Sequence, residues 1–206
     1  MNSKKIIGLT GGYCAGKNHL ASILERRSIP VLDVDKLGHA AIETEKERLL
    51  ERFGDDILSQ DGFIERKRLG NKVFGKPKEL QALEEIIHPV VNRETLAWIN
   101  ARKEAACVIN AALLHRSSAF EMLDAVIIVE APFFVRLLRA RKRDRLPWTA
   151  ILKRLKSQRK FNAQFSKRKT DIYRVKNSVC FGFKKDSAEK KLNKRVNEIL
   201  LIECIE

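Results

Sequence analysis

The chain has 206 residues, of which 44% are hydrophobic and 33% are charged. This composition is too apolar for a disordered chain and too charged for a membrane protein, so it predicts a compact globular domain. Lys and Arg number 41 against 26 Asp and Glu, and the net charge of +15 favours polyanionic partners such as nucleotides, phosphorylated metabolites or nucleic acid. The four cysteines and four histidines lack the spacing of a zinc site or of a disulfide framework.

The first quarter of the chain alternates aliphatic runs with helical patterns. Residues 4–10 predict a buried strand that runs into a glycine pair, and residues 17–27 predict a helix. IPVLDVD, residues 29–35, predicts a second strand that ends with two aspartates, and a helix is expected from Lys36 to about Arg52. Short strands that alternate with helices are typical of a parallel sheet.

The middle of the chain is mainly helical. Turn sequences rich in Gly and Asp occupy residues 53–64, and two or three further helices are predicted between residues 65 and 105. Pro77 is expected at a helix start and Pro89 at a break or kink, because proline lacks the N–H group that a helix interior uses. ACVIN, residues 106–110, predicts another short strand.

The last part of the chain returns to strands alternating with helices. A strand is predicted over residues 125–132, then a strongly basic helix after Pro132 and another helix over residues 146–158. Residues 171–177 are expected as the last strand and residues 186–205 as an amphipathic helix. The whole pattern predicts an α/β fold with a parallel sheet covered by helices on both faces and any ligand at the carboxyl ends of the strands.

GLTGGYCAGK, residues 8–17, has the spacing of a phosphate-binding loop. Gly11, four residues, then Gly16 and Lys17 match G-x-x-x-x-G-K between a predicted strand and a predicted helix. Glycines let the backbone turn and aim N–H groups at phosphates, and the helix N-terminus attracts negative charge. The alternative, a glycine-rich turn that only joins strand and helix, is disfavoured by the motif and its context together.

Two residues of this region raise separate questions. The position after the lysine usually carries Ser or Thr to hold magnesium, and here it is Asn18. An amide oxygen is also an acceptable magnesium ligand, so the substitution weakens the metal argument without removing it. Cys14 is interpreted as a small residue that fills the loop, with a reactive thiolate at the helix N-terminus as the alternative.

Asp33 and Asp35 end the second predicted strand, at the sheet edge that also carries the phosphate loop. A carboxylate there can accept a proton from an attacking hydroxyl group or help to hold magnesium. The alternative is that either aspartate caps the helix that DVDKLGHAAIE opens.

Six segments, taken together, resemble the dephospho-CoA kinase family over nearly the whole chain. They are GLTGGYCAGK, VLDVDKLGHAA, IIHPVV, INAALL, VIIVEAP and a basic helix that ends in RD. The D-x-D and H-P pairs are the discriminating pieces, because the phosphate loop alone occurs in many kinases and NTPases. The resemblance implies a three-layer P-loop kinase fold and ATP-dependent phosphorylation of the ribose 3′-hydroxyl of dephospho-CoA, which gives coenzyme A and ADP.

The resemblance also implies a layout within a single domain, residues 1–206. The nucleotide-binding core would comprise residues 1–35, 106–135 and 171–206, the helical substrate-binding region residues 36–105, and the basic helix and lid residues 136–170.

Roles for individual residues follow from the same resemblance. Lys17, Asp35 and Arg143 would be catalytic, with Asp35 as general base and Arg143 as the lid arginine that stabilises the transferred charge. Asp33, Asp35, His88 and Leu113 would bind dephospho-CoA, and Asn18 and Asp33 would hold Mg²⁺. The residues that would bind ATP are Gly11, Gly12, Tyr13, Cys14, Ala15, Gly16, Lys17, Asn18, His19 and Arg139.

The chain departs from the family pattern in three regions. The basic helix that carries Arg139 and Arg143 is one residue longer than the common spacing, and either arginine is alternatively part of a solvated face. The family often has Pro-Leu-Leu followed by an aromatic residue and a glutamate. At the corresponding residues 112–116 this chain has Ala-Leu-Leu followed by His115 and Arg116, so a base replaces the acidic residue. DIYRVKNSVCFGF matches the expected aspartate-strand-asparagine pattern only loosely, so Asn177 is not included in the site.

For His88, the alternative to a role in acceptor binding is a histidine that packs in the core or in a turn.

Two other functions remain as alternatives. One is a kinase for another small acceptor such as a nucleoside monophosphate, against which the D-x-D and H-P pairs argue. The other is a non-catalytic nucleotide-binding or nucleic-acid-binding relative, which the charge of +15 suggests. Against it, the sequence contains no recognisable RNA-binding or DNA-binding motif and only 7% aromatic residues for base stacking.

The expected partners are ATP, Mg²⁺ and dephospho-CoA, and a monomer is favoured. The longest apolar runs are too short for a bilayer span and the N-terminus lacks a signal-peptide pattern, so a cytoplasmic protein is predicted.

Overall fold

A computed structural model describes residues 4–114, 118–157, 170–178 and 185–205. The chain divides into two compact units: a sheet unit, Met1–Leu32 with Arg102–Glu206, and a helical unit, Asp33–Ala101. Within the described ranges, none of the helices combines the length and the apolar character that a bilayer crossing needs.

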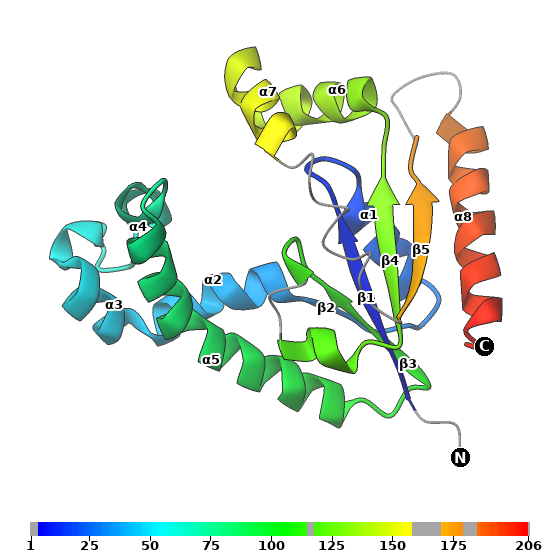
Figure 1. Ribbon diagram of the computed structural model, residues 1–206, viewed down its shortest axis with the longest axis horizontal. Helices are drawn as coiled ribbons and strands as arrows, with labels where there is room; N and C mark the ends of the chain where they lie inside the picture. Colours follow the sequence, from blue (N-terminus) through cyan, green and yellow to red (C-terminus); the bar gives the residue numbers. More distant parts are fainter. Residues whose placement is uncertain (1–3, 115–117, 158–169, 179–184, 206) are drawn as a thin grey trace. The chain divides into compact units, whose positions relative to one another are not determined.

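The sheet unit is built on five strands in the order β2-β3-β1-β4-β5 (Figure 1). They are β1 (Lys5–Gly11), β2 (Val31–Asp33), β3 (Ala106–Asn110), β4 (Ala125–Glu130) and β5 (Asp171–Lys176). Strand β1 pairs in parallel with β3 and β4, and β4 pairs in parallel with β5. The register sets Leu9 opposite Asn110 and Gly11 opposite Val129, so three strands end at one edge. The predicted parallel α/β fold is therefore confirmed.

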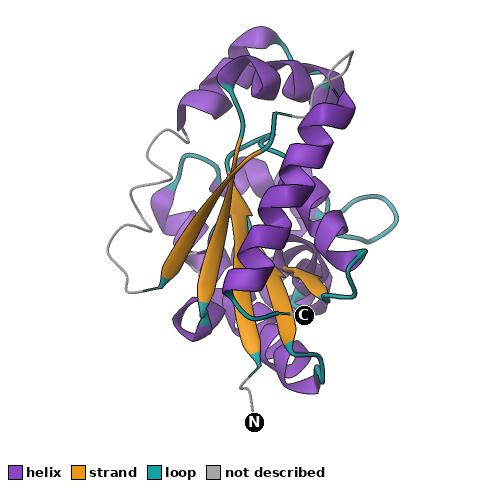
Figure 2. Cartoon of the chain, turned by 90° about the vertical axis from the view of Figure 1, so that its right-hand side faces the viewer, coloured by secondary structure: helices purple, strands orange, loops and turns teal. Residues whose placement is uncertain are grey.

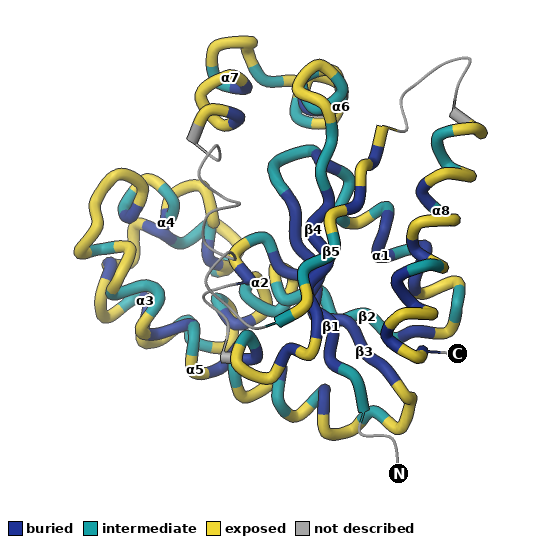
Figure 3. The backbone as a smooth tube through the Cα atoms, turned by 45° about the vertical axis from the view of Figure 1, so that its right-hand side comes forward, coloured by how far each residue is buried: buried dark blue, intermediate teal, exposed yellow. Residues whose placement is uncertain are grey.

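One face of the sheet is covered by α1 (Lys17–Glu25) and α8 (Lys185–Ile202), as Figure 2 shows for α8. Figure 3 shows that burial concentrates in β1, β3 and β4. Each fully buried Leu or Ile stabilises the fold by about 1.5–3 kcal/mol relative to an exposed one. The residues that pack on this face include Ile7, Leu9, Leu20, Ile23, Leu24, Val108, Ile127, Val129, Val196 and Ile199.

The opposite face is approached by the segment that links β3 to β4, which contains a 3-10 helix, η3 (Ser118–Met122). Gly8 lies on this face, since its neighbours Ile7 and Leu9 belong to the core of the other face. A Cβ atom added to Gly8 would lie 2.5 Å from Leu114 and 2.7 Å from Leu123. The small residue therefore lets this segment pack directly on β1.

The sheet unit also carries a basic helical hairpin, α6 (Phe133–Asp144) and α7 (Trp148–Ser157). Arg145 ends α6 in the left-handed conformation, with φ of 53°, and Pro147 precedes the first residue of α7. Apolar residues of the two helices, among them Ala140 and Ile151, form a cluster that includes Tyr13 and Cys14. The hairpin thus packs on the phosphate loop.

The helical unit has its own core. Its helices are α2 (Val34–Thr44), α3 (Lys46–Phe53), the 3-10 helix η1 (Asp55–Ile57), α4 (Arg66–Val73) and α5 (Pro77–Ala101). The buried residues that they share include Ala41, Leu49, Phe53, Ile57, Leu69, Ile86, Ile87 and Val90.

Three sequence predictions for this unit need correction. The helix expected from Lys36 to Arg52 is two helices, because Glu45 between them has a non-helical backbone, with φ of −98° and ψ of 23°. The second strand ends at Asp33 rather than Asp35, which lies in the first turn of α2. Helix α5 continues through Pro89 without a break.

Candidate active site

The phosphate loop connects β1 to α1 at the carboxyl edge of the sheet. Helix α1 begins at Lys17, and its N-cap is Gly16. Among the described residues, no side chain caps this helix, and its first turn contains no acidic residue. The first N–H groups of a helix have no partner within the helix, so an uncapped N-terminus without a carboxylate is suited to an anion.

Gly16 is required at its position for two reasons. Its φ of 98° is in the left-handed region, where residues with a Cβ atom are strained. An added Cβ atom would also overlap the side-chain nitrogen of Asn177 and lie 3.3 Å from Arg139. The glycine therefore allows the helix start, Asn177 and Arg139 to meet.

We expect Gly16→Ala to lower the free energy of unfolding by about 2 kcal/mol or more, because the left-handed strain and the overlap with Asn177 add. Urea unfolding measures the change. Gly38→Ala is the matched control: Gly38 lies inside α2, and an added Cβ atom has no neighbour within 4 Å in the part of the chain that the structure describes. This change should therefore stabilise the protein slightly. Equal effects of the two changes would contradict the packing described for Gly16.

Two arginines of α6 bind the carbonyl groups of the loop. Arg136 Nε donates to the carbonyl oxygen of Tyr13 at 2.8 Å. Arg139 Nη1 donates to the carbonyl oxygens of Cys14 at 3.2 Å and Ala15 at 2.9 Å. These oxygens would otherwise repel a phosphate, so the guanidinium groups fix the loop and neutralise its repulsive side. The contact predicted between Arg139 and ATP stays a prediction.

Asn177 belongs to this arrangement, although the sequence interpretation left it out. It follows β5 directly, is 1% exposed, and its N–H group donates to the carbonyl oxygen of Glu130 at 2.7 Å. Arg139 Nη2 donates to the side-chain oxygen of Asn177 at 3.0 Å and to its carbonyl oxygen at 3.2 Å. The available signal was an asparagine immediately after a strand, at the same carboxyl edge as the loop.

Arg143, the expected lid arginine, lies in a cluster over the tip of the loop. Its Nε donates to Asp144 Oδ1 at 2.7 Å, and its guanidinium carbon lies 5.2 Å from the centre of the Tyr13 ring. The Tyr13 hydroxyl donates to Asp144, and Arg154 lies 3.5 Å from the same carboxylate. The hydrogen bond with Arg143, the largest cause, lowers the pKa of Asp144, while burial raises the pKa of Tyr13.

This cluster predicts a pH-dependent contribution to stability. A carboxyl group whose folded pKa is depressed stabilises the fold above its unfolded pKa, and this contribution is lost as the pH falls through the folded pKa. Asp144→Asn should therefore lower the free energy of unfolding by about 1 kcal/mol at neutral pH, since the partner arginines are largely exposed.

Urea unfolding at pH 7 and near pH 3 provides the measurement, with Asp61→Asn, in an exposed turn, as the control. The difference between Asp144→Asn and the native chain should shrink in acid. A difference that stays constant between the two pH values would count against the ion cluster.

The residues after Gly16 mark the start of α1. Lys17 and His19 are half-buried and Asn18 is exposed. Asn110, at the end of β3, donates from its side-chain nitrogen to Asn18 Oδ1 at 3.4 Å.

Cys14 lies inside the loop, and its pKa is raised. Burial is the largest cause of this shift and outweighs the opposite effect of three nearby arginines. The raised pKa favours the interpretation of Cys14 as a loop-filling residue rather than a reactive thiolate.

In the helical unit, Asp33 and Asp35 have different surroundings. The Asp33 carboxylate accepts the N–H group of Lys36 at 3.2 Å and so caps α2, as the alternative interpretation expected. Asp35 is exposed in the first turn of the same helix. The two carboxylates therefore lie together at one helix N-terminus, and Asp35 is accessible to solvent.

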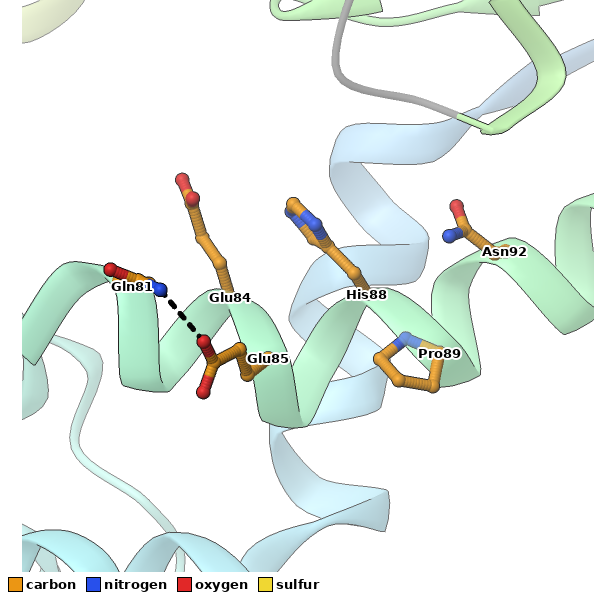
Figure 4. Close-up of a pocket in the computed structure, with 6 residues that line it drawn as sticks. All are labelled: Gln81, Glu84, Glu85, His88, Pro89 and Asn92. Carbon is orange, nitrogen blue, oxygen red and sulfur yellow. Dashed lines mark hydrogen bonds between the residues drawn. The ribbon is translucent and has the colours of Figure 1, made fainter.

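His88 lines a groove of about 480 Å³ along α5. Figure 4 shows Glu84, His88 and Asn92 projecting from the same side of the helix. Leu113, in the sheet unit, is 52% exposed and follows Ala112, whose carbonyl oxygen accepts the Thr10 hydroxyl at 3.5 Å. His115 and Arg116, the departures from the family pattern, lie outside the described residues.

A parallel sheet with a glycine loop before the N-terminus of a helix places the chain in the α/β class of P-loop folds, which kinases share with other NTPases. The sequence model of the family described as Dephospho-CoA kinase matches residues 5–179. The chain is 38% identical over 160 residues to the dephospho-CoA kinase of Anaeromyxobacter dehalogenans, covering 75% of this chain and 76% of that protein. The chain belongs to the dephospho-CoA kinase family.

Solved structures agree on the fold. The crystal structure of TT1252 from Thermus thermophilus is 27% identical, with a TM-score of 0.81 and 97% of each chain covered. A dephospho-CoA kinase from Campylobacter jejuni is 24% identical, with a TM-score of 0.62, 95% of this chain covered and 97% of that one.

Proposed function

We propose that this chain transfers the γ-phosphate of ATP to the 3′-hydroxyl of the dephospho-CoA ribose and releases coenzyme A and ADP, the last step of coenzyme A synthesis. Membership of the family supports the reaction. The observation that carries the proposal is the phosphate loop, where Gly16 opens an uncapped helix and arginines bind the loop carbonyls. A polyphosphate there meets helix N–H groups and Lys17 rather than unpaired carbonyl oxygens.

On the nucleotide side, we propose that residues 11–19 and Arg139 bind ATP. Lys17, the first residue of α1, would bridge the terminal phosphates and neutralise charge as the phosphoryl group moves. Arg143 would turn from Asp144 toward the transferred phosphate when the basic lid, residues 136–170, closes. The Arg143 side chain is 61% exposed, which supports this role. Residues 158–169 of that lid lie outside the described ranges.

On the acceptor side, we propose that the helical region 36–105, with Asp33, binds dephospho-CoA. Asp35 would accept the proton of the attacking 3′-hydroxyl, and its exposure in the first turn of α2 supports this role. Asp33 caps the same helix, which would hold the Asp35 backbone in place. His88 in its groove and exposed Leu113 would contact other parts of the acceptor.

Magnesium is the metal that phosphoryl transfer of this kind requires, and the residues at the loop fit it. Asn18 offers an amide oxygen, and the buried Asn110 Oδ1 beside it has no hydrogen-bond partner among the described residues. When bound, the ion would offset the negative charge of the phosphates. Asp33 stays a second candidate ligand.

For the setting of the protein, we propose a cytoplasmic monomer that takes only small-molecule substrates. Cys14, Cys107 and Cys204 are free thiols, which supports a reducing compartment.

The function is tested by comparing phosphate transfer from ATP to dephospho-CoA, AMP and GMP in the presence of Mg²⁺. We expect rapid transfer to dephospho-CoA and little to either monophosphate. Transfer to a monophosphate alone would instead indicate a nucleoside-monophosphate kinase. Salt-sensitive RNA binding without any transfer would indicate a non-catalytic relative.

A further inference from the structure

A pair of asparagines faces the start of α1. Asn110 is the last residue of β3, paired in register with Leu9 of β1, and Asn18 is the second residue of α1. The Asn110 side-chain nitrogen donates to Asn18 Oδ1 at 3.4 Å. The sheet register therefore sets the Asn110 amide against the residue that follows the loop lysine.

The other end of the Asn110 amide is unsatisfied. Asn110 is 2% exposed, and its Oδ1 is buried without a hydrogen-bond partner among the described residues. A buried amide oxygen without a partner costs stability, and such atoms are rare in folded proteins. The oxygen therefore keeps an acceptor capacity that the described residues do not use.

The ligand chemistry follows from the two amides. In P-loop enzymes magnesium is held by a loop hydroxyl group and by an acidic residue on a neighbouring strand. Here both positions carry side-chain amides, whose oxygens suit a hard divalent cation but bring no negative charge. Two neutral donors bind a free cation weakly, so the phosphates of the nucleotide must supply the remaining attraction.

We propose that Asn18 and Asn110 form a charge-neutral divalent-cation site that is filled only together with the nucleotide phosphates. Asn18 Oδ1 contacts the cation or its water, and Asn110 Oδ1 accepts from, or replaces, a second water of the cation. The inference rests on the proposed function only in requiring that the loop binds ATP; it does not depend on the acceptor.

The test uses Mn²⁺ as a spectroscopic substitute for Mg²⁺ and a non-hydrolysable ATP analogue with an imido link between its β- and γ-phosphates. Electron paramagnetic resonance measures the affinity of the protein–analogue complex for Mn²⁺. Asn110→Leu should lower this affinity about tenfold or more, which is the loss typical when a group that supports a metal ligand is removed. Asn110→Asp adds a negative charge and should raise the affinity about tenfold. Asn71→Leu, on an exposed position of α4, is the matched control and should change nothing.

A second readout separates this role from a structural one. Because Asn110→Leu removes a buried unpaired oxygen, its melting temperature should equal or exceed that of the native chain while Mn²⁺ affinity falls. Unchanged Mn²⁺ affinity in Asn110→Leu overturns the proposal. If that variant fails to fold, unchanged Mn²⁺ affinity in Asn110→Asp overturns it instead. Binding of the analogue without metal is measured separately, so a failure of the nucleotide site is distinguished from a failure of the amide pair.

Discussion

Lys17→Ala is expected to lower ATP-dependent turnover by about a hundred- to a thousandfold, the range found when one preorganised charged or hydrogen-bonding group is removed from a transition state. Lys17 is the first residue of α1, next to Gly16 and half-buried. Its ammonium group would neutralise the terminal phosphates while the phosphoryl group moves, and no other residue of the loop carries a positive charge. Steady-state kinetics with ATP and dephospho-CoA measure the loss.

Lys194→Ala provides the matched control, because Lys194 is an exposed lysine of α8. Both changes remove one positive charge from the sheet unit, so a general effect of the net charge would lower both rates equally. A Lys17→Ala enzyme with near-native turnover would mean that the loop binds its phosphates without the lysine.

Asp35→Asn is expected to lower turnover by about a hundredfold or more, while the affinity for ATP changes little. The amide keeps the size of the side chain but cannot accept the proton of the 3′-hydroxyl group. Since Asp35 is exposed and Asp33 supplies the cap of α2, the substitution should leave the fold intact. The measurement is kcat at saturating substrates together with the binding of ATP.

Asp61→Asn, in an exposed turn of the same unit, controls for the loss of a negative charge. If Asp35→Asn keeps native kcat, Asp35 is not the general base. If its ATP affinity falls as much as its kcat, the residue acts through the nucleotide instead.

The sheet and the phosphate loop were predictable because local patterns determine them. Short aliphatic runs between helical patterns indicated the strands, and Gly11, Gly16 and Lys17 have a spacing that few other functions explain. The structure places this loop between β1 and α1, as expected. Its site roles, in contrast, stay predictions that the experiments above address.

Element boundaries in the helical unit were less predictable. Asp33 followed a strand-like run, and only its capping contact with Lys36 shows that α2 starts at Val34. The break at Glu45 has no proline or glycine beside it, because its neighbours in the sequence are Thr44 and Lys46. Pro89 is tolerated because it lies on an exposed side of α5, where the carbonyl group it leaves without a partner can meet water.

The contacts that shape the loop are tertiary, which is why sequence spacing did not show them. Arg136, Arg139 and Asn177 are more than a hundred residues from the loop along the chain but bind its backbone or lie against Gly16. The pairing of Asn110 with Asn18 likewise follows from the strand order, which places β3 beside β1. Such contacts can be predicted only when the strand order is known, because the strand order decides which distant residues lie next to the loop.

The central claim is that the loop directs the outermost phosphate of ATP to a ribose oxygen of dephospho-CoA. Incubation with ATP that carries ¹⁸O in its γ-phosphoryl group, followed by mass spectrometry and ³¹P NMR of the product, tests it most directly. The account predicts one labelled phosphomonoester on the 3′-oxygen of dephospho-CoA for each ADP released. Release of labelled inorganic phosphate without a labelled nucleotide product would contradict it.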